Sequence, residues 1–280
     1  MNILRIKQSL TILYKHPIKI LNILNFRKLN KFIKNIFFNA DINFLNLAKK
    51  KQIKILLESF SKIKSINKND YEDKKIFPEA SLDEFQKKYL NDPECDNFSK
   101  LFEKFGSDKT KNKYNYLYYE IISKNKINNI AEIGMGSNNI EIPSNMGAGG
   151  KPGASLRAFS EYLPNSNIYG ADIDKDILFQ KKNIKNFFIN QLDINSILKF
   201  KSQIPKMDLI IDDGLHLPDA NLNIINNLID HLNKDGFLII EDIENIFLHI
   251  LSVVENSFNA KKNFQSQLIQ VNDGGLLIIK

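Results

Sequence analysis

The chain contains 280 residues, which is long enough for one large α/β domain and an additional segment. Its single cysteine, Cys95, excludes an internal disulfide and a paired-cysteine metal or redox motif, so a cytoplasmic location is expected. The net charge of +7 is uneven, because residues 1–54 contain 12 basic residues and one acidic residue, whereas the rest of the chain contains 27 basic and 31 acidic residues.

Residues 1–65 are predicted to form a basic, amphipathic helical arm. Isoleucine, leucine and phenylalanine are interleaved with lysine and arginine, and Pro17 interrupts the pattern. Charges break every apolar run well before the roughly 20 residues that a membrane span needs, so neither a signal peptide nor a transmembrane helix is predicted here. Residues 1–54 suit either peripheral contact with the inner face of an anionic membrane, or packing on the catalytic domain or on another subunit of a homo-oligomer.

Residues 66–122 are predicted to be a linker and a helical lid region. They are mainly polar and contain Pro78 and Pro93. Near their end, the turn from Gly106 to Thr110 is followed by a helix rich in tyrosine. Tyr114 and Tyr118 of that helix either face a sugar or belong to an aromatic core, and both interpretations stay open.

Residues 123–280 alternate between apolar runs and helical patterns, which is typical of an α/β domain with a doubly wound, mostly parallel sheet. The turn sequence Asn272-Asp273-Gly274-Gly275 predicts a closing β-hairpin. The strands expected before the hairpin are residues 129–134, 167–172, 186–190, 208–212 and 237–241, and those of the hairpin are residues 267–271 and 276–280.

The ends of the first two predicted strands indicate a cofactor site. The first strand ends in Glu132-Ile133-Gly134-Met135-Gly136, where the glycines let the backbone approach a ligand closely. The second ends in Asp172-Ile173-Asp174, which places a carboxylate where ribose hydroxyls can bind, although a carboxylate there can also serve only the strand end. Asp172 lies almost twice as far from the glycines as in a dinucleotide fingerprint, and Glu132 would repel phosphates. A cofactor with a cationic amino-acid end is therefore favoured.

Two later apolar runs end in carboxylates. Residues 208–211 precede Asp212-Asp213, and residues 237–240 precede Glu241-Asp242. Neighbouring parallel strands would bring these side chains together, with His216 beside them, and clustered carboxylates favour a hard divalent cation such as Mg²⁺. The alternative is that Asp212 and Asp213 cap the helix that begins near Pro218 and that His216 is a surface histidine.

The motifs together resemble those of class I S-adenosylmethionine-dependent methyltransferases, through Glu132 to Gly136 and the acid Asp172. Within that class they are similar to the metal-dependent sugar O-methyltransferases of the mycinamicin and macrocin type and their relatives in surface-polysaccharide clusters. The resemblance covers residues 101–280 and implies a Rossmann-like, seven-stranded sheet with an antiparallel last strand, preceded by a helical N-terminal appendage. The four matching segments are Gly153 to Arg157, Gly170 to Asp174, Asp212 to His216 and Ile240 to Asp242.

The same resemblance implies roles for individual residues. Asp213, Glu241 and Asp242 are the implied Mg²⁺ ligands, and His216 is the implied catalytic base. The long loop 137–152 is expected to be a lid over the methionine end of the cofactor. The implied substrate is a sugar or nucleotide-sugar hydroxyl of a surface-glycan or natural-product precursor. The residues expected to bind S-adenosylmethionine are Glu132, Gly134, Gly136, Asp172, Asp174, Gln191, Asp193 and Asp212, with Gln191 and Asp193 near the adenine.

Other functions stay open at this point: a cofactor-binding scaffold without catalysis, and a methyltransferase for a different small molecule or for nucleic acid. The isoelectric point near 9.1 would suit nucleic acid. Nucleic acid is nevertheless not expected as a partner, because the basic surplus lies in one arm and the fourth strand lacks the Asn/Asp-Pro-Pro-aromatic tip of base methyltransferases. The complete set of carboxylates and His216 argues against a scaffold.

Overall fold

The structure, a computed structural model, describes residues 75–259, 264–271 and 274–280. The predicted arm, residues 1–65, lies outside these ranges, so its two proposed roles stay predictions. No helix within the described ranges combines the length and the apolar character needed to cross a bilayer.

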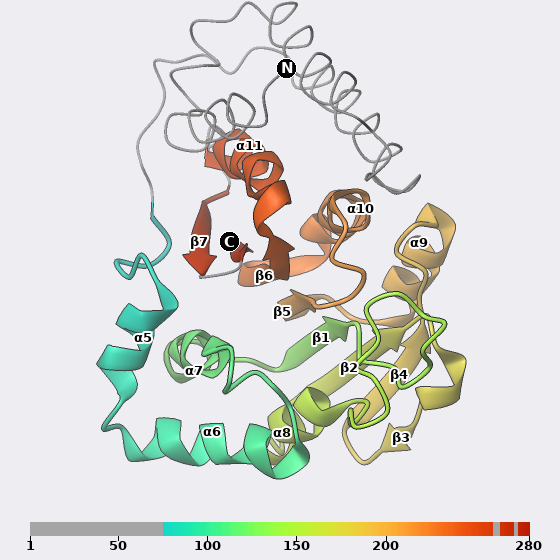
Figure 1. Cartoon of the computed structure of the whole chain (residues 1–280), viewed down its shortest axis with the longest axis horizontal. Coiled ribbons are helices and arrows are strands. Elements are labelled where there is room, and N and C mark those ends of the chain that lie inside the picture. The colour runs from blue at the N-terminus through green and yellow to red at the C-terminus, as the bar shows by residue number, and fades with distance from the viewer. Residues whose placement is uncertain (1–74, 260–263, 272–273) are drawn as a thin grey trace, which may run out of the picture.

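Within the part of the chain that the structure describes, one eight-stranded sheet forms the core, with the order β3-β4-β2-β1-β5-β6-β8-β7 (Figure 1). Strands β4, β2, β1, β5 and β6 are parallel, β8 is antiparallel to β6, and β7 is antiparallel to β8. The predicted α/β, doubly wound sheet with an antiparallel last strand is confirmed. The strands are β1 (Asn129–Ile133), β2 (Asn167–Asp172), β3 (Gln180–Lys181), β4 (Ile184–Phe188), β5 (Met207–Asp212), β6 (Leu232–Glu244), β7 (Ser266–Val271) and β8 (Gly274–Ile279).

The sheet differs from the predicted seven strands at one edge. The two-residue strand β3 pairs antiparallel with β4, so the sheet has an eighth, short strand. Strand β4 also begins two residues earlier than predicted, because Ile184 pairs with Ile168 of β2 and is fully buried. Such a short strand carries no periodic pattern that a sequence could display.

Helices cover both faces of the sheet, and two hydrophobic clusters fill the space between them (Figure 1). One cluster joins one face of the sheet to α9, α10 and α11, and the other joins the opposite face to α5, α6, α7 and α8. The central strands are therefore buried on both sides, which explains their continuous apolar runs. The helices are α5 (Leu82–Tyr89), α6 (Pro93–Phe105), α7 (Tyr114–Lys124), α8 (Ala154–Tyr162), α9 (Ile194–Gln203), α10 (Pro218–Leu228) and α11 (Leu248–Asn259).

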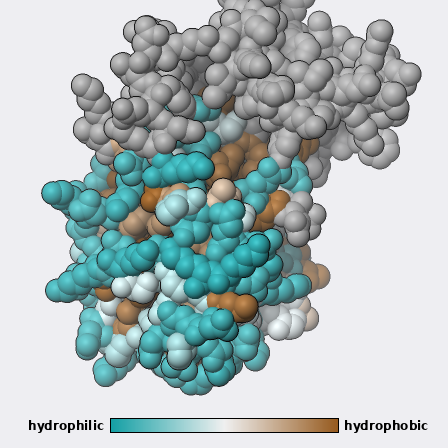
Figure 2. All heavy atoms as spheres, turned by 90° about the vertical axis from the view of Figure 1, so that its left-hand side faces the viewer, coloured by the Kyte–Doolittle hydropathy of each residue, from teal (hydrophilic) through white to brown (hydrophobic). Residues whose placement is uncertain are grey.

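Three helices occupy the region predicted to be a linker and helical lid. Helix α6 has sharp ends, because Asp92 accepts hydrogen bonds from the backbone N–H of Glu94 and Cys95, and Gly106 ends it with a φ of 80°. Phe85 of α5 and Phe102 of α6 are fully buried in the cluster that also contains the sheet. The outer face that these helices present is mainly hydrophilic (Figure 2).

Candidate active site at the carboxyl ends of three strands

The site lies where the chain order of the sheet reverses. From β1 the chain continues to β2 on one side, whereas β5 pairs with β1 on the other side. Ligands of open parallel α/β sheets bind at such a switch point, outside the carboxyl ends of the strands. Glu132 near the end of β1, Asp212 at the end of β5 and Asp242 at a bulge within β6 place carboxylates at this edge. The sequence predicts these carboxylates but not the bulge.

A buried lysine joins carboxylates from three strands. The ammonium Nζ of Lys109 lies 2.6 Å from Oδ2 of Asp213 and 3.3 Å from Oε1 of Glu132, and it also donates to Oε2 of Glu241. Its side chain is only 2% exposed. Burial alone would lower the pKa of Lys109, but the attraction of Asp213, Glu241 and Glu132 outweighs it and raises the pKa well above its usual value. Lys109 is therefore a permanent internal cation of the site.

Two tyrosines of α7 donate hydrogen bonds to carboxylates of β6. The hydroxyl of Tyr118 donates to Oε1 of Glu241, and that of Tyr114 donates to Oδ1 of Asp242 at 2.5 Å. Both rings are buried, and burial followed by the nearby Glu241 carboxylate raises the pKa of both phenols. These hydroxyls therefore stay protonated as donors. The interpretation as an aromatic core is confirmed, because both rings belong to a hydrophobic cluster. That these residues face a sugar stays a prediction.

Asp213, His216 and Asp242 form a group that can hold a metal ion. Each offers one ligand atom, and these atoms lie within 4.8 Å of one another. His216 and Asp242 have φ values of 54° and 49°, a backbone conformation that costs energy in a non-glycine residue and is concentrated at functional sites. At Asp242 the register between β6 and β8 shifts, so this β-bulge turns the carboxylate toward Asp213.

Glu241 is the one predicted ligand that does not belong to this group. Its carboxylate is 1% exposed, and its two oxygens accept hydrogen bonds from Lys109 and Tyr118. Burial raises the pKa of Glu241 well above its usual value, although the nearby Lys109 ammonium opposes this effect. The structure thus brings together all three predicted carboxylates, but only two of them face the ligand space.

A cavity of about 160 Å³ lies beside Asp213 of this group. Five of the predicted site residues line it: Gly134, Gly136, Asp172, Gln191 and Asp213. Gly134 has a φ of 88°, and a Cβ atom there would lie 2.1 Å from the carbonyl oxygen of Asp213. The first glycine is therefore required both by its backbone conformation and by the close approach of the β5 loop.

Asp172 is held in position at the end of β2. Its Oδ2 accepts the backbone N–H of Met135 at 2.7 Å, and its Oδ1 accepts that of Asp174 at 2.9 Å. Burial raises the pKa of Asp172, while the backbone hydrogen bonds oppose this effect. Asp174 accepts hydrogen bonds from the Ser137 hydroxyl and from the backbone N–H of Asp176, and it does not line the cavity.

Three other predicted cofactor residues also lie outside the cavity wall. Glu132 is buried between Lys109 and the hydroxyl of Ser155, which donates to it at 2.5 Å, and burial raises its pKa. Asp193 is exposed and caps α9 by accepting the backbone N–H of Asn195 at 3.0 Å. Asp212 is fully buried and has a pKa raised to about 6 by burial.

Gln191 connects the wall of this cavity to Asp212 and to the loop that follows β5. Its amide donates to Oδ1 of Asp212 at 2.6 Å and accepts the backbone N–H of Leu215 at 2.8 Å. Asn221 of α10 donates to the other oxygen of Asp212 at 3.0 Å. Through Gln191, Asp212 therefore holds the loop after β5, which carries Asp213 and His216.

The loop 137–152, which is expected to be a lid, forms part of the wall of this cavity, the smaller of two beside the carboxylate group. Ile142, Pro143 and Ser144 line it, and the hydroxyl of Ser144 donates to the carbonyl of Leu215 at 3.2 Å. The base of the loop is closed by the backbone N–H of Met146, which donates to the carbonyl of Ser137 at 2.8 Å.

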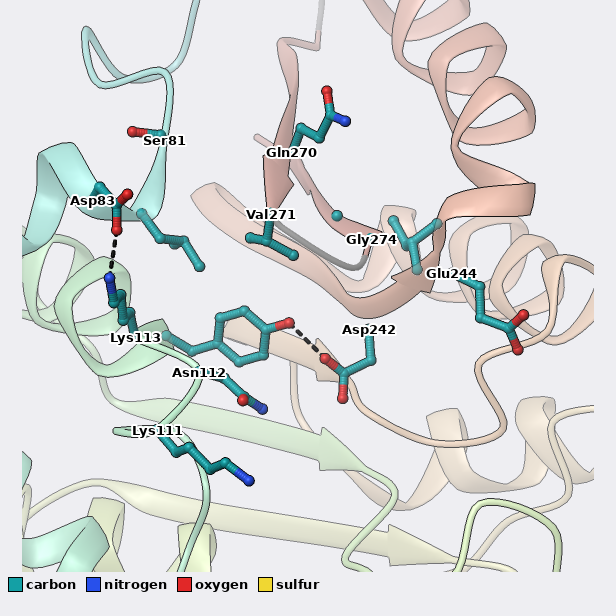
Figure 3. A pocket seen from close by; sticks show the side chains of 14 residues that line it. Ser81, Asp83, Lys111, Asn112, Lys113, Asp242, Glu244, Gln270, Val271 and Gly274 are labelled. Atoms are coloured by element: carbon teal, nitrogen blue, oxygen red, sulfur yellow. Dashed lines mark hydrogen bonds and ion pairs between the residues drawn. The ribbon is translucent and has the colours of Figure 1, made fainter. Parts of the chain in front are cut away.

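A second, larger cavity of about 770 Å³ lies on the other side of Asp242 (Figure 3). Its walls are the start of α5, the loop before α7, the end of β6 and the β7–β8 hairpin. Tyr114 and Asp242 both line it, and the hydroxyl of Tyr114 donates to Oδ1 of Asp242. The larger cavity thus reaches the same carboxylate group as the smaller one.

Lys109 contacts three carboxylates of the site, but none of the predictions from the sequence names it as a site residue. It lies 104 positions before Asp213 in the chain, in the turn Gly106 to Thr110. That turn is the only sequence signal for it, because a lysine in a polar turn is otherwise expected to be exposed.

No protein-family model matches the chain. It is similar to the 8-demethyl-8-alpha-L-rhamnosyl tetracenomycin-C 2'-O-methyltransferase of Streptomyces olivaceus, with 27% identity over 92 residues, which are 33% of this chain and 24% of the relative. It is also similar to the L-olivosyl-oleandolide 3-O-methyltransferase of Streptomyces antibioticus, with 28% identity over 113 residues, 40% of this chain and 27% of the relative. The chain thus matches only about a quarter of the length of these relatives.

Among solved structures, the chain resembles the MycE methyltransferase of the mycinamycin biosynthetic pathway in complex with Mg and SAH. The TM-score is 0.53 and the identity 18%, over 65% of this chain and 54% of that one. The chain therefore has the fold of a class I methyltransferase, and the resemblance to macrolide-sugar O-methyltransferases that its motifs predict is confirmed.

Proposed function

We propose that the protein transfers a methyl group from S-adenosylmethionine to a hydroxyl group of a sugar, with Mg²⁺ in the carboxylate group. One observation carries this proposal. Asp213 lines the smaller cavity and Asp242 lines the larger one, yet both belong with His216 to a single group suited to a metal ion. A cofactor on one side and an acceptor on the other would meet at that group.

The smaller cavity is the proposed cofactor site. We assign the ribose hydroxyls to the Asp172 carboxylate, which two backbone N–H groups orient. Ile173 and Leu192 also line this cavity and are about half exposed. We propose that these two apolar side chains contact the adenine ring. Gly134 and Gly136 also line this cavity, and we assign the methionine end of the cofactor to their backbone.

The donor set fits Mg²⁺, since carboxylate oxygens are the ligands that this ion prefers. We propose Asp213 and Asp242 as ligands. Glu241 lies outside this group, and its two oxygens accept hydrogen bonds from Lys109 and Tyr118. When bound, the ion lowers the pKa of a nearby acceptor hydroxyl and neutralises the carboxylates.

His216 is the proposed general base. Its Nδ1 is buried and has no hydrogen-bond partner within the described part of the chain, so it is available to accept a proton. In the proposed step, the hydroxyl oxygen of the sugar bonds to the methyl carbon while the bond from that carbon to sulfur breaks. His216 takes the hydroxyl proton, and the products are the methyl ether and S-adenosylhomocysteine.

The test combines calorimetric binding of S-adenosylhomocysteine and Mg²⁺ with transfer of a labelled methyl group to a panel of nucleotide sugars and glycosides. The wild-type protein is expected to bind S-adenosylhomocysteine and to methylate at least one sugar in a Mg²⁺-dependent way. Asp242→Asn is expected to keep cofactor binding but to lose both metal binding and transfer. Asp235→Asn, at an exposed position of β6 that also has a positive φ, is the matched control and should behave as wild type. Absence of cofactor binding to the wild type would refute the proposal.

Two wider proposals concern the cell. We propose that the protein acts in the cytoplasm on a surface-glycan or natural-product precursor, and that residues 1–54 contact the inner face of the membrane. Both follow from the sequence, and the arm lies outside the described residues. Co-sedimentation of the full chain with anionic and with neutral vesicles tests the second, because binding that survives high salt or neutral lipid would contradict an electrostatic contact.

A further inference from the structure

We propose that the larger cavity accepts a sugar that carries a phosphate group, with the reacting hydroxyl at Asp242 and the phosphate near Lys111 and Lys113. The inference rests on the proposed function and specifies its substrate class. It depends on three features of the cavity. Its walls are held in place by the core, its lining includes many polar groups, and its acidic and basic side chains lie at different positions along it.

The walls of the cavity are held in place by the core. Ser81 caps α5 by accepting the backbone N–H of Glu84 at 3.3 Å, and Leu82, the next residue, is only 4% exposed. The segment before α5 is fastened to β7 by Gln267, which accepts the backbone N–H of Phe77 at 2.8 Å and donates to the carbonyl of Glu79 at 2.7 Å. The cavity is therefore part of the folded structure, within the size range of ligand sites.

The lining is mixed, with polar groups slightly in excess. Asn112, Gln270 and Ser81 contribute polar side chains, and Gly274 and Gly275 expose backbone. Leu82 and Val271 are among the apolar residues of the wall. An acceptor with a large apolar body would leave these polar groups without partners, which costs binding free energy. A hydrophilic glycoconjugate is therefore the better match.

The charges of the cavity are separated along its length. Asp242 and Glu244 lie on β6, whereas Lys111 and Lys113 lie on the loop before α7, on the other side of the space (Figure 3). A ligand that spans the cavity would meet the carboxylates of β6 at one end. At the other end it would meet the two lysines together with Asp83, the partner of Lys113. Its reacting hydroxyl belongs at Asp242, so its anionic group belongs at the lysines.

The two lysines can be recruited at low cost. Lys111 is exposed and has no ion-pair partner within the ranges that the structure describes. Lys113 lies 2.5 Å from Asp83, but the two side chains are 39% and 65% exposed, and an exposed ion pair contributes little to stability. A phosphate can therefore replace Asp83 as the partner of Lys113, and it carries more charge than the carboxylate.

The experiment measures binding to the full chain loaded with S-adenosylhomocysteine and Mg²⁺. The ligands share one sugar and differ in its substituent: a neutral methyl glycoside, the sugar 1-phosphate, the nucleoside-diphosphate sugar and a short prenyl-diphosphate sugar. A phosphorylated form is expected to bind at least tenfold more tightly than the methyl glycoside. The last two arms distinguish a nucleotide carrier from a lipid carrier.

Three variants locate the effect. Lys111→Gln is expected to weaken binding of the phosphorylated sugar about tenfold, and Asp83→Asn is expected to strengthen it because Lys113 is released. Lys126→Gln makes the same charge change as Lys111→Gln at an exposed site before β1, at the opposite end of α7, and should leave binding unchanged. Opposite signs for Lys111→Gln and Asp83→Asn are not expected from damage to the fold.

The outcomes separate this inference from the proposed function. Equal binding and methylation of neutral and phosphorylated sugars, with no effect of Lys111→Gln, would refute the phosphate site while the methyltransferase stands. Methylation of a sugar confined to phosphorylated forms supports both. S-adenosylhomocysteine binding without methylation of any sugar would refute the proposed sugar substrate, and the substrate class proposed here with it.

Discussion

The ammonium of Lys109 lies 2.6 Å from the Asp213 carboxylate and is almost completely buried, so a positive charge from the chain itself is fixed beside a proposed metal ligand. Only one oxygen of Asp213 accepts from Lys109, which leaves the other free to face His216 and Asp242. The same ammonium restrains Glu241 behind them. Lys109 thus orients the group and offsets part of the repulsion among its carboxylates.

Lys109→Met is predicted to weaken Mg²⁺ binding about 10- to 100-fold, the usual effect of removing a partner that orients a metal ligand. It should also lower the free energy of unfolding by about 3–5 kcal/mol, because buried carboxylates lose their counter-charge. Calorimetric Mg²⁺ titration and urea unfolding measure the two effects. Tyr118→Phe removes one hydrogen bond to Glu241 and leaves Lys109 intact, so its effects should be smaller. Unchanged Mg²⁺ affinity in folded Lys109→Met would contradict the orienting role.

His216→Asn is predicted to lower kcat by about 10²- to 10⁴-fold through the loss of a general base. Asparagine is chosen because it tolerates the positive φ of 54° at this position, so the backbone should be preserved. S-adenosylhomocysteine binding should be unchanged. Loss of Mg²⁺ affinity in this variant would instead identify His216 as a ligand, and single-turnover kinetics together with metal titration separate these roles.

Gly134→Ala is predicted to destabilise the protein by about 1–3 kcal/mol and to abolish cofactor binding, because its Cβ would collide with the backbone of the Asp213 loop. Gly149→Ala is the matched control. Gly149 has no atom within 4 Å of such a Cβ and no positive φ, so its change should stay within about 0.5 kcal/mol. Thermal unfolding and S-adenosylhomocysteine titration of both variants check the comparison. Similar behaviour of the two would mean that the close approach at Gly134 is unimportant.

Glu120 gives a pH-dependent prediction away from the site. Burial alone would raise the pKa of this carboxyl, but hydrogen bonds from Lys124, Lys88 and Tyr89 lower it below its usual value. A lowered pKa in the folded state means that the unfolded state binds more protons in acid. The stabilisation is therefore present above the usual pKa of about 4.3 and is lost as the pH falls through the lower, folded-state pKa.

Glu120→Gln is accordingly predicted to lower the free energy of unfolding by about 1–3 kcal/mol at pH 7, with the difference from wild type shrinking below pH 4. Urea unfolding between pH 3 and pH 7 measures this trend. Asp96→Asn, which removes an exposed pair with Lys100, is the control and should show little effect at any pH. A constant difference between Glu120→Gln and wild type across the range would contradict the titration argument.

The sequence predicted strands correctly where both faces of the strand are buried. Residues 208–212 and 237–241 lie inside a sheet covered on both faces, so their apolar runs carry a clear signal. Strand β3 is too short to produce one, and the packing of α5 and α6 into the core could not be derived from segments that are polar on their outer faces. The cap residues Asp92 and Gly106 are visible in the sequence, but they mark only where α6 begins and ends.

Side-chain roles were harder to derive than strand positions. The sequence indicates that Asp213 and Asp242 meet, since both follow neighbouring parallel strands. It does not show that Glu241 faces Lys109 and Tyr118, because successive residues of a strand point to opposite sides and a bulge changes that alternation at Asp242. Asp193 follows a strand end too, yet it caps α9, a role that an acid at a loop–helix junction fills equally well.

The amino-acid sequence by itself determined the order of strands and helices, the cofactor-binding end of the sheet and the meeting of two carboxylates, because these follow from local periodicity and the geometry of parallel strands. Only the tertiary structure decided which residues surround those carboxylates. The burial of Lys109 among three acids depends on how α7 and its preceding turn pack on the sheet. Contacts between groups about a hundred residues apart arise from that packing, and no local pattern in the sequence encodes them.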